Sequence, residues 1–249
     1  MIKHTLKNGT SLFYNPDKHV YMVNNVIVPS VTGICGKGVP KPQLINWMVY
    51  TPLNEFKKLI KEKLDNNLPI DNVELERIKK SASSKTTTVK EDAGMVGTVV
   101  HDLIERHLKG LSIAEQSDPK VVNCWNLFVK WWEKSGYEVV ELEKKIYSSK
   151  WDYAGTLDLI VKDEKGSLVL IDIKTSNSIS FDYYLQLNAY KVAYEEETKQ
   201  KIRKALIVRL PKKDSEIEFR DIPLTKDLFK AFIGAKNIWQ EMKKLNGSL

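Results

Sequence analysis

Two aspartates in the middle of the chain lie among apolar residues that are typical of β-strands. The stretch 153–176 reads YAGTLDLIVKDEKGSLVLIDIKTS, and the short glycine-containing loop between Lys162 and Leu168 predicts a β-hairpin. If Lys162 pairs with Leu168, Asp158 lies directly across from Asp172. Facing carboxylates repel each other because their Cβ atoms are only about 4.5–5.5 Å apart. We therefore expect a cation between these two acids.

The second strand of this hairpin also carries a lysine. Asp172 follows four apolar residues, a pattern typical of a strand that is covered on both faces. Side chains alternate along a strand, so Lys174 shares a face with Asp172 and could orient or deprotonate a water, or neutralise charge developing on a phosphate. Oxygen ligands with at most one imidazole favour Mg²⁺ or Mn²⁺ over a thiolate metal. The alternative is that Asp158 is a strand-end acid and that Asp172 and Lys174 form a solvated pair.

Other polar residues are candidates because of their helical spacing. The pattern predicts a helix from Glu91 to Lys109, on which His101 and Glu105 share a face. A further predicted helix, at about 180–198, carries Gln186 and Tyr190 on one face. The alternatives are a boundary histidine with a surface glutamate, and a glutamine and tyrosine that belong to the core.

The strand predicted before the hairpin, at 137–147, carries two acids of its own, Glu141 and Glu143. They are weaker candidates for the site, because most such glutamates are solvated.

The first third of the chain is expected to form an accessory region, residues 1–88, in which helices predominate. Its predicted elements are two or three short strands within 11–28, an N-cap at Ser30 or Thr32, a loop at 36–42, helices at about 42–50, 52–66 and 71–82, and a linker at 81–88. The lysines of this region are candidates for contacts to phosphate groups.

Residues 89–249 are expected to form an α/β domain. After the helix at 91–109 we expect a helix at about 118–135, the strand at 137–147, the hairpin, the helix at 180–198, strands near 203–210 and 216–222, and a final helix from Thr225. This order predicts a mixed central β-sheet flanked by helices.

Composition limits the kind of protein. The chain has 249 residues, a formal net charge of +7 and only two cysteines. The positive charge favours a polyanionic partner, and two distant cysteines make neither a disulfide framework nor a four-cysteine metal centre. No apolar run approaches the roughly 18 residues of a membrane span, and no secretory signal opens the sequence. We therefore expect a soluble, intracellular (cytoplasmic) protein.

Taken together, these residues resemble the RecB-like branch of the PD-(D/E)XK nuclease superfamily, in particular phage-type exonucleases. The resemblance covers about residues 91–194 and is carried by Gly97-Thr98 with His101 and Glu105, Gly155-Thr156-Leu157-Asp158, Asp172-Ile173-Lys174-Thr175, and Gln186 with Tyr190.

The resemblance implies a restriction-endonuclease-like core with a metal-dependent nuclease site. By it, His101, Asp158, Asp172 and the backbone carbonyl of Ile173 would bind Mg²⁺ or Mn²⁺. Lys174 would be the catalytic lysine, Gln186 and Tyr190 would form the helix motif behind it, and Glu105 would belong to the site. The four cysteines of the iron–sulfur members are absent, and no GxxxxGK[ST] motif is present, so unwinding would have to come from a partner.

The expected function is therefore that of a deoxyribonuclease, an exonuclease acting on single-stranded DNA or duplex ends in recombination, repair or replication. Residues 1–88 would clamp the DNA. Two alternatives stay open at this point. One is a structure- or sequence-selective endonuclease on the same core, and the other is a catalytically inactive DNA-binding protein.

Overall fold

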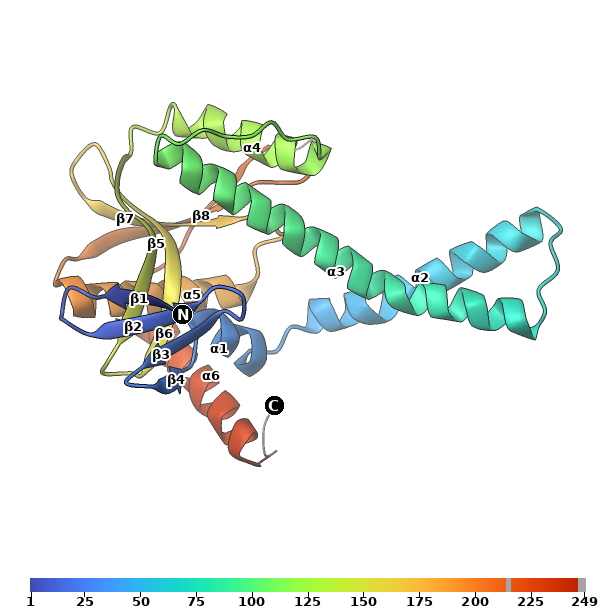
Figure 1. The fold of residues 1–249 in the computed structure, drawn as a ribbon, viewed down its shortest axis with the longest axis horizontal. Coiled ribbons are helices and arrows are strands. Elements are labelled where there is room, and N and C mark those ends of the chain that lie inside the picture. The colour runs from blue at the N-terminus through green and yellow to red at the C-terminus, as the bar shows by residue number, and fades with distance from the viewer. Residues whose placement is uncertain (214–215, 246–249) are drawn as a thin grey trace. The chain divides into compact units, whose positions relative to one another are not determined.

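The computed structural model describes residues 1–213 and 216–245. The chain forms two compact units, one built from Met1–Val39 together with the chain from Val99 onward and the other from Pro40–Thr98. Figure 1 shows the helices and strands of both units. Among the described residues, no helix combines the length and the apolar character needed to cross a membrane.

A five-stranded sheet is the centre of the first unit, with strands in the order β5-β6-β7-β8-β9. The strands are β5 (Glu138–Ser148), β6 (Tyr153–Lys162), β7 (Leu168–Lys174), β8 (Ile202–Arg209) and β9 (Glu218–Asp221). All neighbours pair antiparallel except β7 and β8, which are parallel. A parallel pair needs a crossover, and α5 (Phe181–Thr198) provides it. The predicted mixed α/β sheet is confirmed.

The core of this unit lies between the sheet and three helices, α1 (Val31–Gly38), α5 and α6 (Lys226–Leu245). Helix α5 contacts strands β5 to β8, while α1 and α6 pack against α5 and each other. The sheet contributes fully buried apolar residues such as Leu157, Ile160 and Leu170. Their burial is the main source of stability for the strands that carry the acids. A further helix, α4 (Pro119–Trp132), begins after the N-cap Asp118.

A small antiparallel sheet precedes this core in the sequence. It contains β1 (Ile2–Thr5), β2 (Ser11–Asn15), β3 (Val20–Val23) and β4 (Val26–Val28). The two turn residues between β3 and β4, Asn24 and Asn25, have φ of 50° and 62°, as in a two-residue type I′ turn. Leu12 and Val28 pack with Ala154 of β6, so this sheet is attached to the start of the hairpin.

Helix α1 extends further than the sequence predicted. Ser30 is its N-cap and accepts a hydrogen bond from the Gly33 amide at 3.0 Å, as one of the two predicted caps. The predicted loop at 36–42 is wrong in its first half, because α1 continues to Gly38. A Cβ at Gly38 would lie 2.3 Å from the Ala235 carbonyl oxygen of α6, so glycine here allows two helix backbones to approach closely.

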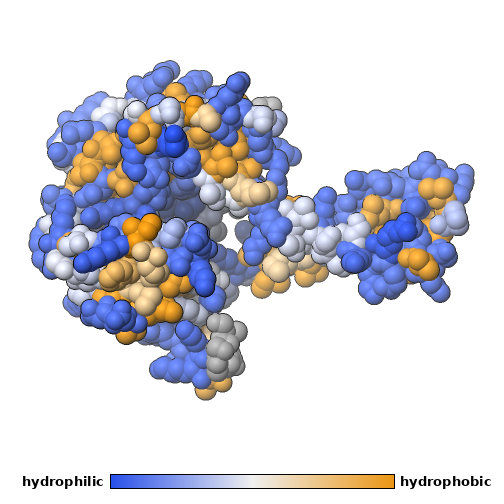
Figure 2. Space-filling view, viewed as in Figure 1, coloured by the Kyte–Doolittle hydropathy of each residue, from blue (hydrophilic) through white to orange (hydrophobic). Residues whose placement is uncertain are grey.

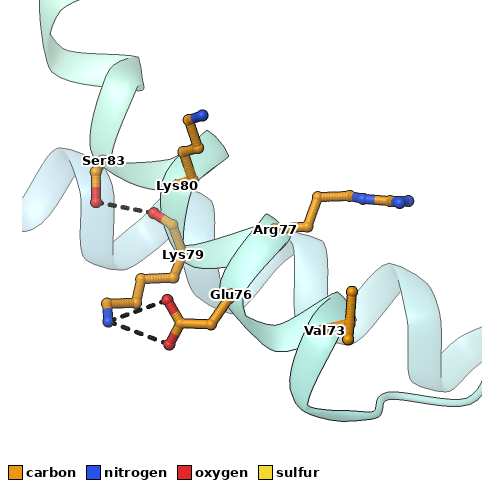
Figure 3. Close-up of a pocket in the computed structure, with 6 residues that line it drawn as sticks. All are labelled: Val73, Glu76, Arg77, Lys79, Lys80 and Ser83. Atoms are coloured by element: carbon orange, nitrogen blue, oxygen red, sulfur yellow. Dashed lines mark hydrogen bonds and ion pairs between the residues drawn. The ribbon is translucent and has the colours of Figure 1, made fainter.

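The second unit consists of α2 (Pro42–Asp65) and the first part of α3 (Asn72–Leu108). The predicted helices at 42–50 and 52–66 form one helix that contains Pro52. The predicted linker at 81–88 is wrong, because it lies within α3. Hydroxyl groups in this polar stretch donate to carbonyls of the preceding turn, Ser83 to Lys79 (Figure 3) and Thr88 to Ser84, which lets these residues remain helical.

The boundary expected at residue 88 falls inside α3 and does not coincide with the division into compact units. Residues 1–39 group with the sheet domain, and the helical segment 40–98 is inserted between its two parts. On the visible face of the second unit, separate apolar patches lie among hydrophilic residues (Figure 2).

Candidate active site

The hairpin has the expected register as far as it extends. Lys162 pairs with Leu168, and the ladder continues to Leu159 and Ile171. It ends there, one pair before the two aspartates would meet. The backbone pairing of β6 and β7 therefore stops just before Asp158. Beyond this point a backbone amide of β7 bonds to the Asp158 side chain instead of to the backbone of β6.

That backbone partner is the amide of Ile173, which donates a hydrogen bond to Asp158 Oδ2 at 2.8 Å. Charge-assisted hydrogen bonds to a carboxylate are among the stronger ones in proteins, so this bond fixes the position of the acid. In an extended strand, the N–H and C=O of one residue point to the same side. The Ile173 carbonyl, which the resemblance implies as a metal ligand, therefore also faces β6.

The other acid of the hairpin is more deeply buried. Asp172 has an exposed fraction of 1% and lies 2.6 Å, Oδ2 to Nζ, from Lys174. Gln186 of α5 donates to the second oxygen, Oδ1, at 3.1 Å. Gln186 also donates to the Tyr190 hydroxyl at 3.1 Å. The structure thus brings together four residues that the sequence suggested from two separate motifs.

Burial and charge act in opposite directions at this pair. Burial raises the pKa of Asp172 and the neighbouring Asp158 adds to this, while Lys174 opposes it. Burial lowers the pKa of Lys174, but the carboxylates of Asp172 and Asp158 raise it by more, so that it lies above its ordinary value. The ammonium group also lies 4.8 Å from the centroid of the Tyr183 ring.

A second group of candidate ligands forms around Asp158. His101 Nδ1 of α3 is 3.8 Å from Asp158 Oδ2 and 3.9 Å from Glu143 Oε1. One ligand atom from each of the three side chains lies within 4.8 Å of the others. Burial lowers the pKa of His101, but the two carboxylates raise it by more. The structure therefore places His101 beside Asp158, as the sequence suggested.

Glu143 was only a weaker candidate in the sequence, and the register of β5 explains why its place was not visible there. The register shifts by one residue between Val139 and Glu141, and the pairs Leu142↔Leu159 and Lys144↔Leu157 then place Glu143 opposite Asp158. Without this shift the strand would set a leucine opposite Glu143. Its side chain is 25% exposed, so it is partly buried beside His101 and Asp158.

Glu105 does not join these ligands. On α3 it forms an ion pair with Lys109, one turn later. Its charge also acts on Lys145. Burial lowers the pKa of Lys145, and the carboxylates of Glu143 and Glu105 offset part of this decrease. Its assignment to the site remains a prediction from the resemblance.

Gly155 allows α5 to approach the sheet at the site. A Cβ at Gly155 would lie 2.7 Å from Tyr190 Cε1 and 3.3 Å from Val31 Cγ2. The absence of a side chain therefore lets the Tyr190 ring lie against the backbone of β6, where its hydroxyl reaches Gln186. On the next residue of the strand, the Thr156 hydroxyl lies 2.7 Å from the Tyr21 hydroxyl of β3.

The donor set fits a hard divalent cation. Carboxylate oxygens and one imidazole nitrogen converge from α3, β5 and β6, which is a suitable set for Mg²⁺ or Mn²⁺. Asp172 Oδ2 is buried and, among the described residues, has an ion pair with Lys174 but no hydrogen bond of good geometry. A buried oxygen in this state is suited to accept a further positive partner.

The mixed five-stranded sheet flanked by helices, with an acid on β6 and an acid–x–lysine sequence on β7, has the restriction-endonuclease-like fold of PD-(D/E)XK nucleases. Residues 129–245 match the family model described as the PD-(D/E)XK nuclease superfamily. The matched part, just under half of the chain, therefore has the restriction-endonuclease-like fold, and the match supports a nuclease. The match contains the hairpin and α5, whereas His101 lies outside it.

Two solved structures are similar to this chain at a low level. The structure of SSO0001 has 15% identity and a TM-score of 0.32, over 58% of this chain and 84% of that one. A candidate exonuclease from Eubacterium rectale has 11% identity and a TM-score of 0.41, over 62% of this chain and 69% of that one. The comparison with curated proteins gave no match.

Proposed function

We propose that this chain is a Mg²⁺- or Mn²⁺-dependent deoxyribonuclease of the RecB-like branch, and that it acts as an exonuclease on single-stranded DNA or duplex ends. The observation that carries the nuclease site is the convergence of Asp158, Asp172 and Lys174 at the open end of the hairpin. Its setting in a PD-(D/E)XK nuclease domain supports the reaction class. The preference for ends rests on the sequence resemblance described above.

The residues have separate roles in this proposal. Asp158, Asp172, His101 and the Ile173 carbonyl would hold the metal, which supplies an activated water and neutralises charge on the phosphate when bound. Lys174 positions the attacking water and the phosphate from the same face of β7. Gln186, held by Tyr190, fixes the Asp172 carboxylate through its 3.1 Å hydrogen bond.

Residues 1–88 are proposed to hold the DNA strand, with the lysines of α2 as phosphate contacts. A role in DNA recombination, repair or replication, with a helicase supplied by a partner, is part of the same proposal, because no nucleotide-binding motif is present in the sequence.

Digestion of end-labelled linear and circular single-stranded DNA tests this function. With Mg²⁺ or Mn²⁺, the wild-type chain should degrade linear DNA progressively from an end and leave circles intact, and EDTA should stop the reaction. Asp172→Asn serves as the matched inactive control because it keeps the shape of the side chain. Cleavage of circles would favour an endonuclease instead. Absence of metal-dependent cleavage of either substrate would contradict the proposed activity.

A further inference from the structure

The active-site acid and lysine of β7 have counterparts on β5. Asp172 and Lys174 are two residues apart on β7, and Glu143 and Lys145 have the same spacing on β5. Both strands pair antiparallel with β6, so they run in the same direction on either side of Asp158. Two acid–lysine pairs therefore flank one central aspartate, although only the pair on β7 belongs to the sequence motif.

The register of the sheet arranges these groups in two rows. Glu143 lies opposite Asp158, which is adjacent to Asp172, and this row contains the acids. One step along, Lys145 pairs with Thr156. On β7 the ladder to β6 ends at Ile171, and Lys174 beyond it lies 2.6 Å from Asp172. A carboxylate row beside an ammonium row suits a cation bound next to a phosphate group.

Glu143 has an unusual backbone conformation for a residue within a strand. It has φ of 49°, a left-handed conformation that is uncommon for a residue of this type within a strand. Non-glycine residues persist in such conformations only where the surrounding structure holds them there. Its carboxylate lies 3.9 Å from His101 and 3.9 Å from Lys145.

Lys145 forms a loose ion pair with this acid. Its ammonium group donates to the Glu143 backbone carbonyl at 3.0 Å and lies 5.2 Å from the centroid of the Tyr14 ring. The 3.9 Å separation from the Glu143 carboxylate is much longer than the 2.6 Å of the Lys174–Asp172 pair. The Glu143 carboxylate is therefore less committed to its lysine than Asp172 is, and is better able to take another positive partner.

We propose, on the basis of the nuclease function above, that Glu143 and Lys145 form a second acid–lysine half of the active site. Glu143 is a ligand to a divalent cation that it shares with His101 and Asp158. Lys145 contacts a phosphate of the bound nucleic acid from the side opposite to Lys174. The site then extends across three strands instead of the two that the sequence motif covers.

Metal titration without DNA tests the role of Glu143. Calorimetric titration with Mn²⁺ should show at least roughly tenfold weaker binding for Glu143→Gln and Glu143→Asn than for the wild type. Asparagine tolerates the left-handed backbone, so the second variant removes the carboxylate while keeping the local fold. Glu141→Gln is the matched control, because that acid contacts Lys7 and Lys144 instead. Affinity equal to the wild type in both Glu143 variants would overturn the ligand assignment.

Binding of end-labelled single-stranded DNA in Ca²⁺ tests the role of Lys145. Lys145→Met should weaken binding and reduce the slope of log affinity against log salt by about one contact. Lys165→Met is the matched control, because Lys165 is an exposed residue in the loop at the other end of the hairpin. An unchanged affinity and slope for Lys145→Met would overturn this half of the proposal.

These outcomes are separable from failure of the nuclease function itself. If the wild type binds Mn²⁺ and Asp158→Asn abolishes that binding, the ion site exists whatever its catalytic activity. Normal Mn²⁺ binding by the Glu143 variants would then refute only the second half of the site. A wild-type chain that binds no Mn²⁺ would overturn the ion site and, with it, the role of Glu143.

Discussion

The two compact units are built from different interactions. Strand β6 has seven buried residues out of ten, whereas α2 has none in 24. The strands of the sheet domain are therefore stabilised by apolar burial. The second unit buries fewer apolar side chains, such as Ile78 and Ala82 of α3, and adds ion pairs such as Lys63–Glu74. A charged side chain is held in one position most firmly where buried apolar residues surround it. The buried Asp172–Lys174 pair belongs to the first unit.

The largest expected effect is on the reaction. Asp172→Ala and Lys174→Ala should each lower the cleavage rate by roughly a thousandfold or more, because each removes a charge at the reacting phosphate. Initial rates on labelled DNA with Mg²⁺ measure this. Lys165→Ala, in the exposed loop at the other end of the hairpin, should keep most of the activity. Wild-type turnover in either active-site variant would refute the site assignment.

Matched leucine truncations should separate the units by stability. Leu157→Ala in β6, where the side chain is fully buried, should cost about 2–5 kcal/mol of unfolding free energy. Leu53→Ala in α2, where the side chain is 55% exposed, should change it by less than about 0.5 kcal/mol. Urea denaturation gives both values. Equal costs would show that the second unit buries this leucine after all.

Metal binding should stabilise one unit only. At a metal concentration of a hundred times Kd, the binding free energy adds about 2.7 kcal/mol to the stability of the unit that holds the ion. Hydrogen exchange should slow in β5 to β7 on addition of Mg²⁺ and stay unchanged in α2. Uniform slowing along the chain would contradict this distinction, and no slowing would count against the ion site.

A methyl group at Gly155 should lower both the stability of the sheet domain and the cleavage rate. Gly155→Ala would place a Cβ 2.7 Å from the Tyr190 ring, so we expect a cost of about 1–3 kcal/mol. Because Tyr190 contacts Gln186, which in turn contacts Asp172, cleavage should also fall. Thermal denaturation and initial rates measure the two effects. Tyr190→Leu in the same chain should recover part of the lost stability, and no recovery would mean that the clash lies elsewhere.

The smallest effect is expected at an exposed ion pair of the second unit. Lys79 Nζ lies 3.2 Å from Glu76 Oε1 on α3, and both side chains are more than 60% exposed (Figure 3). Lys79→Ala should change the unfolding free energy by no more than about 1 kcal/mol, and high salt should abolish the difference. A larger, salt-independent loss in denaturation experiments would indicate that this pair is not an ordinary surface contact.

The hairpin and the helix behind it could be predicted because local patterns determine them. Alternating apolar residues and a short loop fixed the pairing of Lys162 with Leu168, and helical spacing placed Gln186 and Tyr190 on one face. The turn at Asn24-Asn25 and the cap at Ser30 have local signatures of the same kind. These features need no knowledge of distant residues.

The rest depends on interactions that are not visible in a short window of sequence. A one-residue shift of register in β5 decides which residue of β6 faces Glu143, and the pattern of that strand does not reveal it. The serines and threonines of α3 were read as a linker because they favour turns, yet their hydroxyls bond within the helix. Gly38 indicated a loop, but its partner is a helix backbone near residue 235.

The order of the segments along the chain has a consequence for synthesis on the ribosome. Residues 1–39 belong with the sheet, but 40–98 must be translated before any part of the sheet emerges. At about 5–20 residues per second, the opening segment would wait several seconds for its partner strands. The Ala154 amide, which bonds to the Pro29 carbonyl at 2.9 Å, is made later still. The apolar residues by which the small N-terminal sheet contacts Ala154, such as Leu12 and Val28, therefore stay uncovered by β6 until that strand has been made.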